Sequence, residues 1–415
     1  MTHTDDTTRL LARIEGYRDE MVALQRDLTA VVALGPDNGG DGEWRRAEFI
    51  KERARSFGLD DVTELHAPDL RVPAGLRPNL LFRVRGRAER PTVWVMAHMD
   101  TVPPGELSLW DGDPYAAVVK DGTIVGRGVE DNQQGLTSGL FALRALVEEA
   151  VAPTTDVCLL LVSDEETGNA YGIEHVLAAA PDLFDPEDLV IVPDAGSPEG
   201  ALLEVAEKCT LWVRFVVRGR QVHASIPAAG INAHRGSATL AVRLDARLHE
   251  AFSDEDPLFE PPVSTFEPTK REANVPNVNT IPGEDVFYFD CRLLPAHAID
   301  EVKSVVAEVV REVESELGVK IDIGYPAELP AAPPTAPDSP VVEALSHAIR
   351  ELRGLTPYPI GIGGGTVAAV FRRRGLPAVV WATLEETAHS PNEYCRIDNL
   401  VADAKVFGRV FVRGE

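Results

Sequence analysis

The sequence predicts an α/β protein with a mostly parallel sheet flanked by helices, interrupted by an inserted α+β domain of ferredoxin-like type. Apolar runs of strand length alternate with segments of helical period over residues 1–204 and again after residue 326. Between them, residues 205–325 change to long strands rich in β-branched residues and two helices. Because 415 residues exceed one comfortable core, we expect a discontinuous main domain, 1–204 with 326–415, and an inserted domain, 205–325.

The first part of the chain alternates helices with strands. Apolar residues at helical spacing, among them Leu10, Ile14 and Met21, predict one long amphipathic helix over residues 6–34. A second helix is expected at about 44–57. Further strands are expected at 79–85, 91–97, 124–129, 158–163 and 189–196, and further helices at 135–150 and 170–180.

The inserted domain and the C-terminal part follow the same logic. In the insertion we expect a strand or strand pair at 209–227, a helix at 233–252, a loop-rich stretch at 253–276, a strand at 286–295, a helix at 300–317 and a strand at 320–326. The proline- and alanine-rich residues 327–340 predict an extended linker. After it come helices at 341–353, 366–374 and 398–412, a glycine-rich turn at 361–366 and a strand at 377–384.

Composition excludes several classes of partner. The formal net charge of −26 disfavours nucleic acids and anionic membranes, which both select basic surfaces. No apolar run is long enough for a membrane span, and the N-terminus lacks the features of a signal peptide, so we expect a cytoplasmic protein. The cysteines show no CxxC spacing, and buried free thiols are expected at Cys158, Cys209, Cys291 and Cys395.

Chemistry-bearing residues collect where apolar strands end. His98 and Asp100 follow the strand at 91–97 and leave an extended chain on the same face. Asp100 could hold one ring nitrogen while the other binds a metal ion, the alternative being a buried histidine satisfied by its neighbour. Asp131 ends a glycine-flanked segment; it could also be a helix N-cap.

Three adjacent acids, Asp164, Glu165 and Glu166, follow the strand at 158–163. Side by side after a buried strand they repel one another, so a positive partner is expected to neutralise them. Adjacent glutamates also permit a division of labour, in which one binds metal and the other acts as a general base.

Two more strand ends supply Asp194, after 189–193, and His389, in the segment that follows 377–384. Strand ends that offer His, Asp, Glu, Asp and His are hard to explain independently. Histidine and carboxylate ligands without cysteine suit zinc, cobalt or manganese.

Together, HMDTVP (98–103), GRGVED (126–131), DEE (164–166), PDAG (193–196), the inserted block and the late histidine resemble the M20 metallopeptidase and deacylase family. The resemblance implies a dinuclear site that Asp131 bridges. It implies that His98 and Asp194 complete the ligands of one metal, and Glu166 and His389 those of the other. Asp100 would orient His98, and Glu165 would be the general base.

The resemblance also implies that the insertion is a lid domain that mediates dimerisation, so we expect a homodimer. His223, in GRQVHASIP, would stabilise an oxyanion, although an ordinary surface histidine is the alternative. Arg292 would bind a substrate carboxylate bidentately, with a salt bridge inside the sheet as the alternative. Further substrate contacts are expected at Asn279 in NVPNVNTIPG and at Gly364, Gly365 and Thr366 in the glycine-rich turn.

The sequence departs from the family pattern in two places. The family often has Asp-Met-Lys-Gly where this chain has Asp131-Asn132-Gln133-Gln134-Gly135, which removes a lysine near the site. It often continues Gly-Gly-Thr with Asp or Ser-Asp, where this chain has Val367-Ala368-Ala369. Both changes leave the metal-ligand pattern intact and bear on the substrate.

The sequence favours a dinuclear-metal amidohydrolase that cleaves a peptide or N-acyl amide bond, with Glu165 as base toward a metal-activated water. Two divalent ions are expected, zinc before cobalt or manganese. The substrate is expected to carry a free carboxylate, as an N-acyl amino acid does. A dipeptidase or carboxypeptidase of the same family is the alternative within this class, and a non-catalytic binding protein on the same fold is the alternative from another class.

Overall fold

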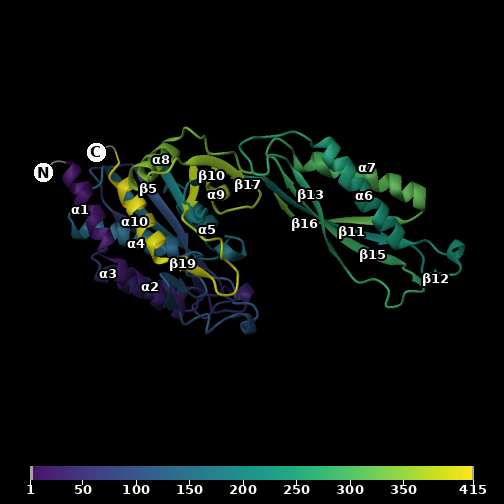
Figure 1. Cartoon of the computed structure of the whole chain (residues 1–415), viewed down its shortest axis with the longest axis horizontal. Coiled ribbons are helices and arrows are strands. Elements are labelled where there is room, and N and C mark those ends of the chain that lie inside the picture. The colour runs from purple at the N-terminus through teal and green to yellow at the C-terminus, as the bar shows by residue number, and fades with distance from the viewer. Residues whose placement is uncertain (1–2, 414–415) are drawn as a thin grey trace. The chain divides into compact units, whose positions relative to one another are not determined.

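The computed structural model describes residues 3–413, which form two compact units (Figure 1). The first comprises the chain up to Val205, Thr335–Pro359 and the residues from Thr366 onward; the second comprises Ala206–Pro334 and Ile360–Gly365. The boundaries predicted for the insertion, 205–325, end too early. Strand β16 runs Lys320–Leu329, and Ile362 accepts a hydrogen bond from the Lys208 N–H at 3.0 Å, so both segments belong to the second unit.

An eight-stranded sheet organises the first unit, in the order β1-β4-β8-β5-β9-β18-β10-β17. Its strands are β1 (Val62–Glu64), β4 (Leu80–Val84), β5 (Ala88–His98), β8 (Thr155–Val162), β9 (Leu189–Gly196), β10 (Leu202–Glu207), β17 (Tyr358–Ile362) and β18 (Ala378–Ala382). The neighbours β8, β5, β9 and β18 are parallel, whereas β4 and β10 pair antiparallel to them. The predicted mostly parallel α/β sheet is confirmed.

Helices cover both faces of this sheet. On one face, Gly139 of α4 (Gln133–Glu148) lies so close to Leu159 and Val95 that an added Cβ would stand 2.8 Å from the leucine. The alternate residues Trp94 and Cys158 point to the other face, where they share a core with α5 (Ile173–Ala179) and α9 (Ala368–Arg372). The other helices are α1 (His3–Glu15), α2 (Arg18–Ala30), α3 (Trp44–Ser56), α8 (Pro340–Arg353) and α10 (Ile397–Phe411).

Two expectations for the first unit are wrong. The single helix over 6–34 is split into α1 and α2 at Gly16-Tyr17, where glycine disfavours the helix and Tyr17 turns inward against Phe141, at 5.2 Å between ring centroids. The strand expected over 124–129 is only β7 (Thr123–Val125). It belongs to a separate antiparallel sheet with β6 (Val118–Lys120) and β19 (Tyr394–Arg396).

The second unit is an α+β layer, as predicted. Its antiparallel sheet has the order β13-β15-β11-β16, with β11 (Cys209–Arg218), β13 (Thr265–Arg271) and β15 (Glu284–Leu293). Helices α6 (Ala233–Ala251) and α7 (Ile299–Leu317) cover one face (Figure 1). The core between them collects alternate sheet residues and one stripe of each helix, including Leu211, Val213, Phe215, Leu240, Leu244, Val302 and Val306.

Strand β13 lies in the stretch expected to be loop-rich. Its residues after Phe266 are exposed and include Pro268, so it lacks the alternation that marks a strand in the sequence. At the edge of the sheet, only one of its sides needs a hydrogen-bonding partner, and a proline is tolerated there. The linker expected from residue 327 begins only after β16 ends at Leu329, and α8 begins at Pro340.

The remaining elements are short: β2 (Ala67–Pro68), β3 (Leu76–Arg77), β12 (Val222–His223), β14 (Thr280–Ile281) and the 3₁₀ turns Pro36–Asn38, Leu107–Leu109, Glu165–Thr167 and Pro227–Ala229. All the cysteines are buried free thiols, as expected. Among residues 3–413, none of the helices combines the length and the hydropathy that crossing a bilayer requires.

Candidate metal centre

The candidate ligands gather at the carboxyl ends of the parallel strands. His98 is the last residue of β5, Asp194 lies near the end of the adjacent β9, and Glu166 follows β8. His389 comes from the loop after β18, with its backbone in the left-handed region (φ 63°). Asp131 lies on the loop between β7 and α4, and not at the end of a strand as expected. Carboxyl ends of neighbouring parallel strands are where α/β sheets place their sites.

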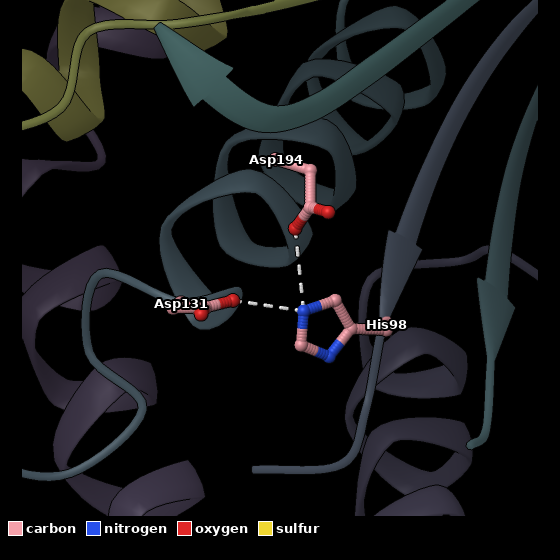
Figure 2. Close-up of side chains that lie close together, drawn as sticks. All are labelled: His98, Asp131 and Asp194. Atoms are coloured by element: carbon pink, nitrogen blue, oxygen red, sulfur yellow. Dashed lines mark hydrogen bonds and ion pairs between the residues drawn. The ribbon is translucent and has the colours of Figure 1, made fainter. Parts of the chain in front are cut away.

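His98, Asp131 and Asp194 form the first group of candidate ligands (Figure 2). The Nε2 atom of His98 lies 2.9 Å from Oδ1 of Asp131 and 3.3 Å from Oδ1 of Asp194. Figure 2 shows both carboxylates directed at this one ring nitrogen from separate segments. The His98 side chain is almost fully buried, whereas the carboxylates of Asp131 and Asp194 are partly exposed.

Asp131, Glu166 and His389 form the second group. The Nε2 atom of His389 lies 3.1 Å from Oδ2 of Asp131 and 3.1 Å from Oε2 of Glu166. Asp131 thus directs one carboxylate oxygen at each histidine. A carboxylate in this position can give one oxygen to each of two ions.

The donor set fits divalent cations. Within a few ångströms, the carboxylates of Asp131, Asp194 and Glu166 face only two imidazoles, so the group carries excess negative charge. In addition, Oε1 of Glu166 is buried without a hydrogen-bond partner. A buried, unsatisfied carboxylate oxygen is costly unless a cation or donor compensates it. Imidazole and carboxylate donors without thiolates suit zinc, cobalt or manganese.

Asp100 connects the two ligand segments. The carbonyl of Asp100 accepts a hydrogen bond from Nδ1 of His98 at 3.0 Å, and its carboxylate Oδ1 lies 3.4 Å from the same nitrogen. This arrangement leaves Nε2 for a metal, although the nearer acceptor is the carbonyl rather than the expected carboxylate. The carboxylate instead accepts from the backbone N–H groups of Glu165, at 3.2 Å, and Glu166, at 3.1 Å.

The three adjacent acids have different environments. Asp164 has a positive φ of 64° and is structural, since it accepts from the Tyr171 N–H at 3.0 Å and from the Thr167 hydroxyl. Glu166 faces His389. In the described part of the chain, the Glu165 carboxylate makes no hydrogen bond or ion pair, and burial, reinforced by the charge of Asp194, raises its pKa well above the usual range.

Metal binding is expected to strengthen with rising pH. Hydrogen bonds to Asp131 and Glu166 raise the pKa of His389 to about 10. Burial lowers the pKa of His98, but its hydrogen bonds to Asp100 and Asp131 outweigh burial, and the net shift is upward. Both imidazoles therefore hold a proton in the metal-free protein at neutral pH, and a metal ligand must be neutral.

Each bound ion should consequently displace about one proton, and its apparent affinity should rise about tenfold per pH unit below the imidazole pKa. Chelator competition at several pH values measures the affinity, and titration in a weakly buffered solution measures the released protons. An affinity that does not change between about pH 6 and pH 8 would contradict this assignment.

His223 and Asn279 lie together in the second unit. His223 is exposed in β12, which pairs with β14, and its Nε2 lies 3.4 Å from Nδ2 of Asn279. Its Nδ1 lies 2.7 Å from the Ser225 hydroxyl. The predicted oxyanion stabiliser, His223, and the predicted substrate contact, Asn279, are therefore neighbours, and their roles stay predictions.

Arg292 forms a salt bridge within the sheet, which the sequence left open as the alternative. Its Nε and Nη2 bind Asp290 at 2.7 and 3.0 Å. Its Nη1 donates to the Thr210 hydroxyl and, at 3.2 Å, to the carbonyl of Gly363 in the glycine-rich turn. A substrate carboxylate would have to compete with Asp290. An added Cβ at Gly365 would meet no atom within 4 Å, and one at Gly364 would meet only the Ile362 side chain, at 3.9 Å. Thr366 belongs to the first unit.

The structural roles of Asn132 and Gln134 were not predicted from the sequence. Asn132 donates to Oδ1 of Asp194 at 2.9 Å and to the Pro193 carbonyl at 2.5 Å, so it fixes the position of a candidate ligand. Gln134 donates to the buried Asp403 at 2.9 Å. Both residues stand in the segment that departs from the family pattern, and that departure was the available signal.

Comparisons with known proteins agree with this geometry. The profile of Peptidase family M20/M25/M40 matches residues 94–413, more than half of the chain. An uncharacterized metallohydrolase of Methanocaldococcus jannaschii is 37% identical over 94% of this chain and 98% of its own. The succinyl-diaminopimelate desuccinylase of Nitratiruptor sp. is 27% identical over 90% and 94%. The crystal structure of human carnosine dipeptidase 1 is similar in fold, with a TM-score of 0.72, 17% identity and 98% of each chain covered.

The family match and the relative from Methanocaldococcus jannaschii both show the family, and the fold agrees with it. The chain belongs to peptidase family M20/M25/M40 and is a metal-dependent hydrolase that acts on amide bonds.

Proposed function

We propose that the chain is a two-metal amidohydrolase that removes the acyl group from an N-acyl amino acid. The observation that carries the proposal is the position of Asp131, whose two carboxylate oxygens face His98 and His389 at 2.9 and 3.1 Å. His98 and Asp194 would hold one ion and Glu166 and His389 the other, with Asp131 shared. Zinc is the proposed metal. Bound divalent ions lower the pKa of water and polarise carbonyl oxygens.

Side chains of the protein are proposed to transfer the proton and to stabilise the oxyanion. Glu165, unpaired among the described residues and half-buried, would take a proton from the attacking water and later deliver it to the departing amine. Its position is set by Asp100, which holds its backbone N–H. His223 is proposed to donate to the developing oxyanion. A His223→Ala variant with unchanged kcat would remove that role.

For the substrate we propose a small molecule or dipeptide with a free carboxylate. Arg292 and the turn at Gly364, Gly365 and Thr366 are the proposed contacts, together with Asn279. A relative with a named activity supports a deacylase. The succinyl-diaminopimelate desuccinylase of Nitratiruptor sp. aligns with this chain over 94% of its own length. A dipeptidase or carboxypeptidase is the second candidate. The second unit is the proposed lid and dimer contact, the protein acting as a cytoplasmic homodimer.

A substrate screen with metal-loaded protein tests the proposal. N-acyl amino acids and dipeptides are compared with matched substrates in which the free carboxylate is converted to an amide. We expect hydrolysis of the N-acyl amino acids and little or none of the amides. Hydrolysis of dipeptides alone would favour the second candidate. Metal binding without any turnover would favour a binding protein, and no binding of transition metal would overturn the proposed centre.

A further inference from the structure

Two buried glutamates that belong to neither ligand group flank the shared ligand and the exposed histidine. Glu130 directly precedes Asp131, and Glu393 follows His389 by four positions. Their exposed fractions are 1% and 0%. Because burying a carboxylate is costly unless hydrogen bonds satisfy it, the partners of each glutamate indicate what it does.

Glu130 holds the backbone of the segment that leads to His389. Its Oε1 accepts a hydrogen bond from the N–H of Glu385, and its Oε2 accepts from the N–H of Thr387 at 2.5 Å and from the Thr387 hydroxyl at 2.7 Å. These donors precede His389 by four and two positions. In that segment Glu386 and His389 both have positive φ, at 60° and 63°, so the loop keeps an unfavourable backbone that needs external support.

Glu393 holds the backbone of the segment that leads to Asp131. Its Oε1 accepts from the N–H groups of Glu130, at 2.9 Å, and Asp131, at 3.1 Å. Its Oε2 accepts from the N–H of Gly128 at 2.9 Å and from Nη1 of Arg127 at 2.6 Å. Every acceptor oxygen of this carboxylate is therefore used within the loop of Asp131.

We propose that Glu130 and Glu393 are positioning residues that form a reciprocal carboxylate clasp. Each glutamate lies beside one ligand and holds the loop of the other, so the pair sets the separation of Asp131 and His389. The two ligands lie in loops rather than in strands of the main sheet, which makes such support necessary. The clasp rests on the proposed two-metal centre, because it prepares the site that would receive the ion shared by those ligands.

The test replaces each glutamate by glutamine and measures metal affinity by chelator competition. In Glu130→Gln, an amide N–H₂ meets the donors of the His389 loop, and we expect about 10- to 100-fold weaker binding of the ion at Glu166 and His389 only. Glu393→Gln disturbs the shared Asp131 and should weaken both ions. The visible spectrum of the cobalt(II) protein should change in both variants.

Hydrogen exchange of the metal-free protein gives a readout that does not depend on metal. The backbone N–H groups of Glu385 and Thr387 should exchange faster in Glu130→Gln than in the unchanged protein. If Glu130→Gln does not fold, Thr387→Val tests the same half of the clasp, since it removes the hydroxyl contact with Glu130. We expect weaker binding of the same ion in that variant, and an unchanged affinity would overturn the clasp.

Asp188→Asn is the matched control. Asp188 is also buried and accepts from the Thr92 N–H, the Trp94 indole and Arg90, but it stands at the start of β9, whereas Asp194 lies near its end. This variant should lower Tm and keep the metal affinity and the cobalt spectrum. Glutamine variants that behave like the control would overturn the clasp. If the wild-type protein binds fewer than two ions, the proposed two-metal function is wrong. Hydrogen exchange at Glu385 and Thr387 still tests the clasp in that case.

Discussion

Replacement of Glu165 by alanine is expected to lower kcat by about 10²- to 10⁴-fold, the range that a general base contributes, while the protein keeps its metal. Glu165 belongs to neither ligand group, and its carboxylate forms no ion pair among the described residues. Its backbone is held by Asp100, so removing the side chain leaves the neighbouring ligand Glu166 in place. Steady-state kinetics and elemental analysis of the same preparation measure both quantities.

Two further variants distinguish the loss of the general base from the loss of side-chain volume and from the change in net charge. Glu165→Gln keeps the size of the side chain and should be as inactive as the alanine variant. Glu174→Ala removes an exposed acid in the first turn of the adjacent helix α5, the same change in net charge, and should leave kcat unchanged. Wild-type turnover by Glu165→Ala with bound metal would remove Glu165 from this role.

The candidate ligands at strand ends could be predicted because the strands themselves could be predicted. Continuous apolar runs such as 158–163 mark buried parallel strands, and their carboxyl ends meet at one edge of the sheet. The pattern of apolar runs is therefore enough to bring His98, Asp194 and Glu166 together. It failed for β13, whose exposed residues and Pro268 hide an edge strand, and for the split of the N-terminal helix at Gly16.

The way Asp131 reaches the site could not be predicted in the same manner. The segment after Ile124 looks like another buried strand, yet only Thr123–Val125 is extended, in a small sheet of its own. The position of Asp131 depends on Glu393, which is 262 positions away in sequence. Contacts at that separation leave no local periodicity. By contrast, the pairing of Arg292 with Asp290 could be anticipated, since residues two apart share a face of a strand.

Replacement of Asp131 by alanine is expected to release both metal ions and to abolish activity. Asp131 is the one residue common to the two candidate ligand groups, with Oδ1 at 2.9 Å from His98 and Oδ2 at 3.1 Å from His389. In the proposed two-metal centre, its loss would remove a donor from each ion and the charge that both ions share. Each ion should bind weaker by more than the 10- to 100-fold that loss of an outer partner typically costs. Elemental analysis and chelator competition measure the result.

Candidate ligands that belong to one group only provide the matched variants. Asp194→Ala should release the ion held with His98 and keep the other, and Glu166→Ala should do the reverse, because each belongs to one group only. Asp131→Ala should match the double variant Asp194→Ala with Glu166→Ala in metal content, although it changes one residue. Retention of one ion at full affinity by Asp131→Ala would show that the groups are independent sites, and the shared-ligand arrangement would have to be abandoned. Retention of neither, with a folded protein, would leave Asp131 as the residue on which both sites depend.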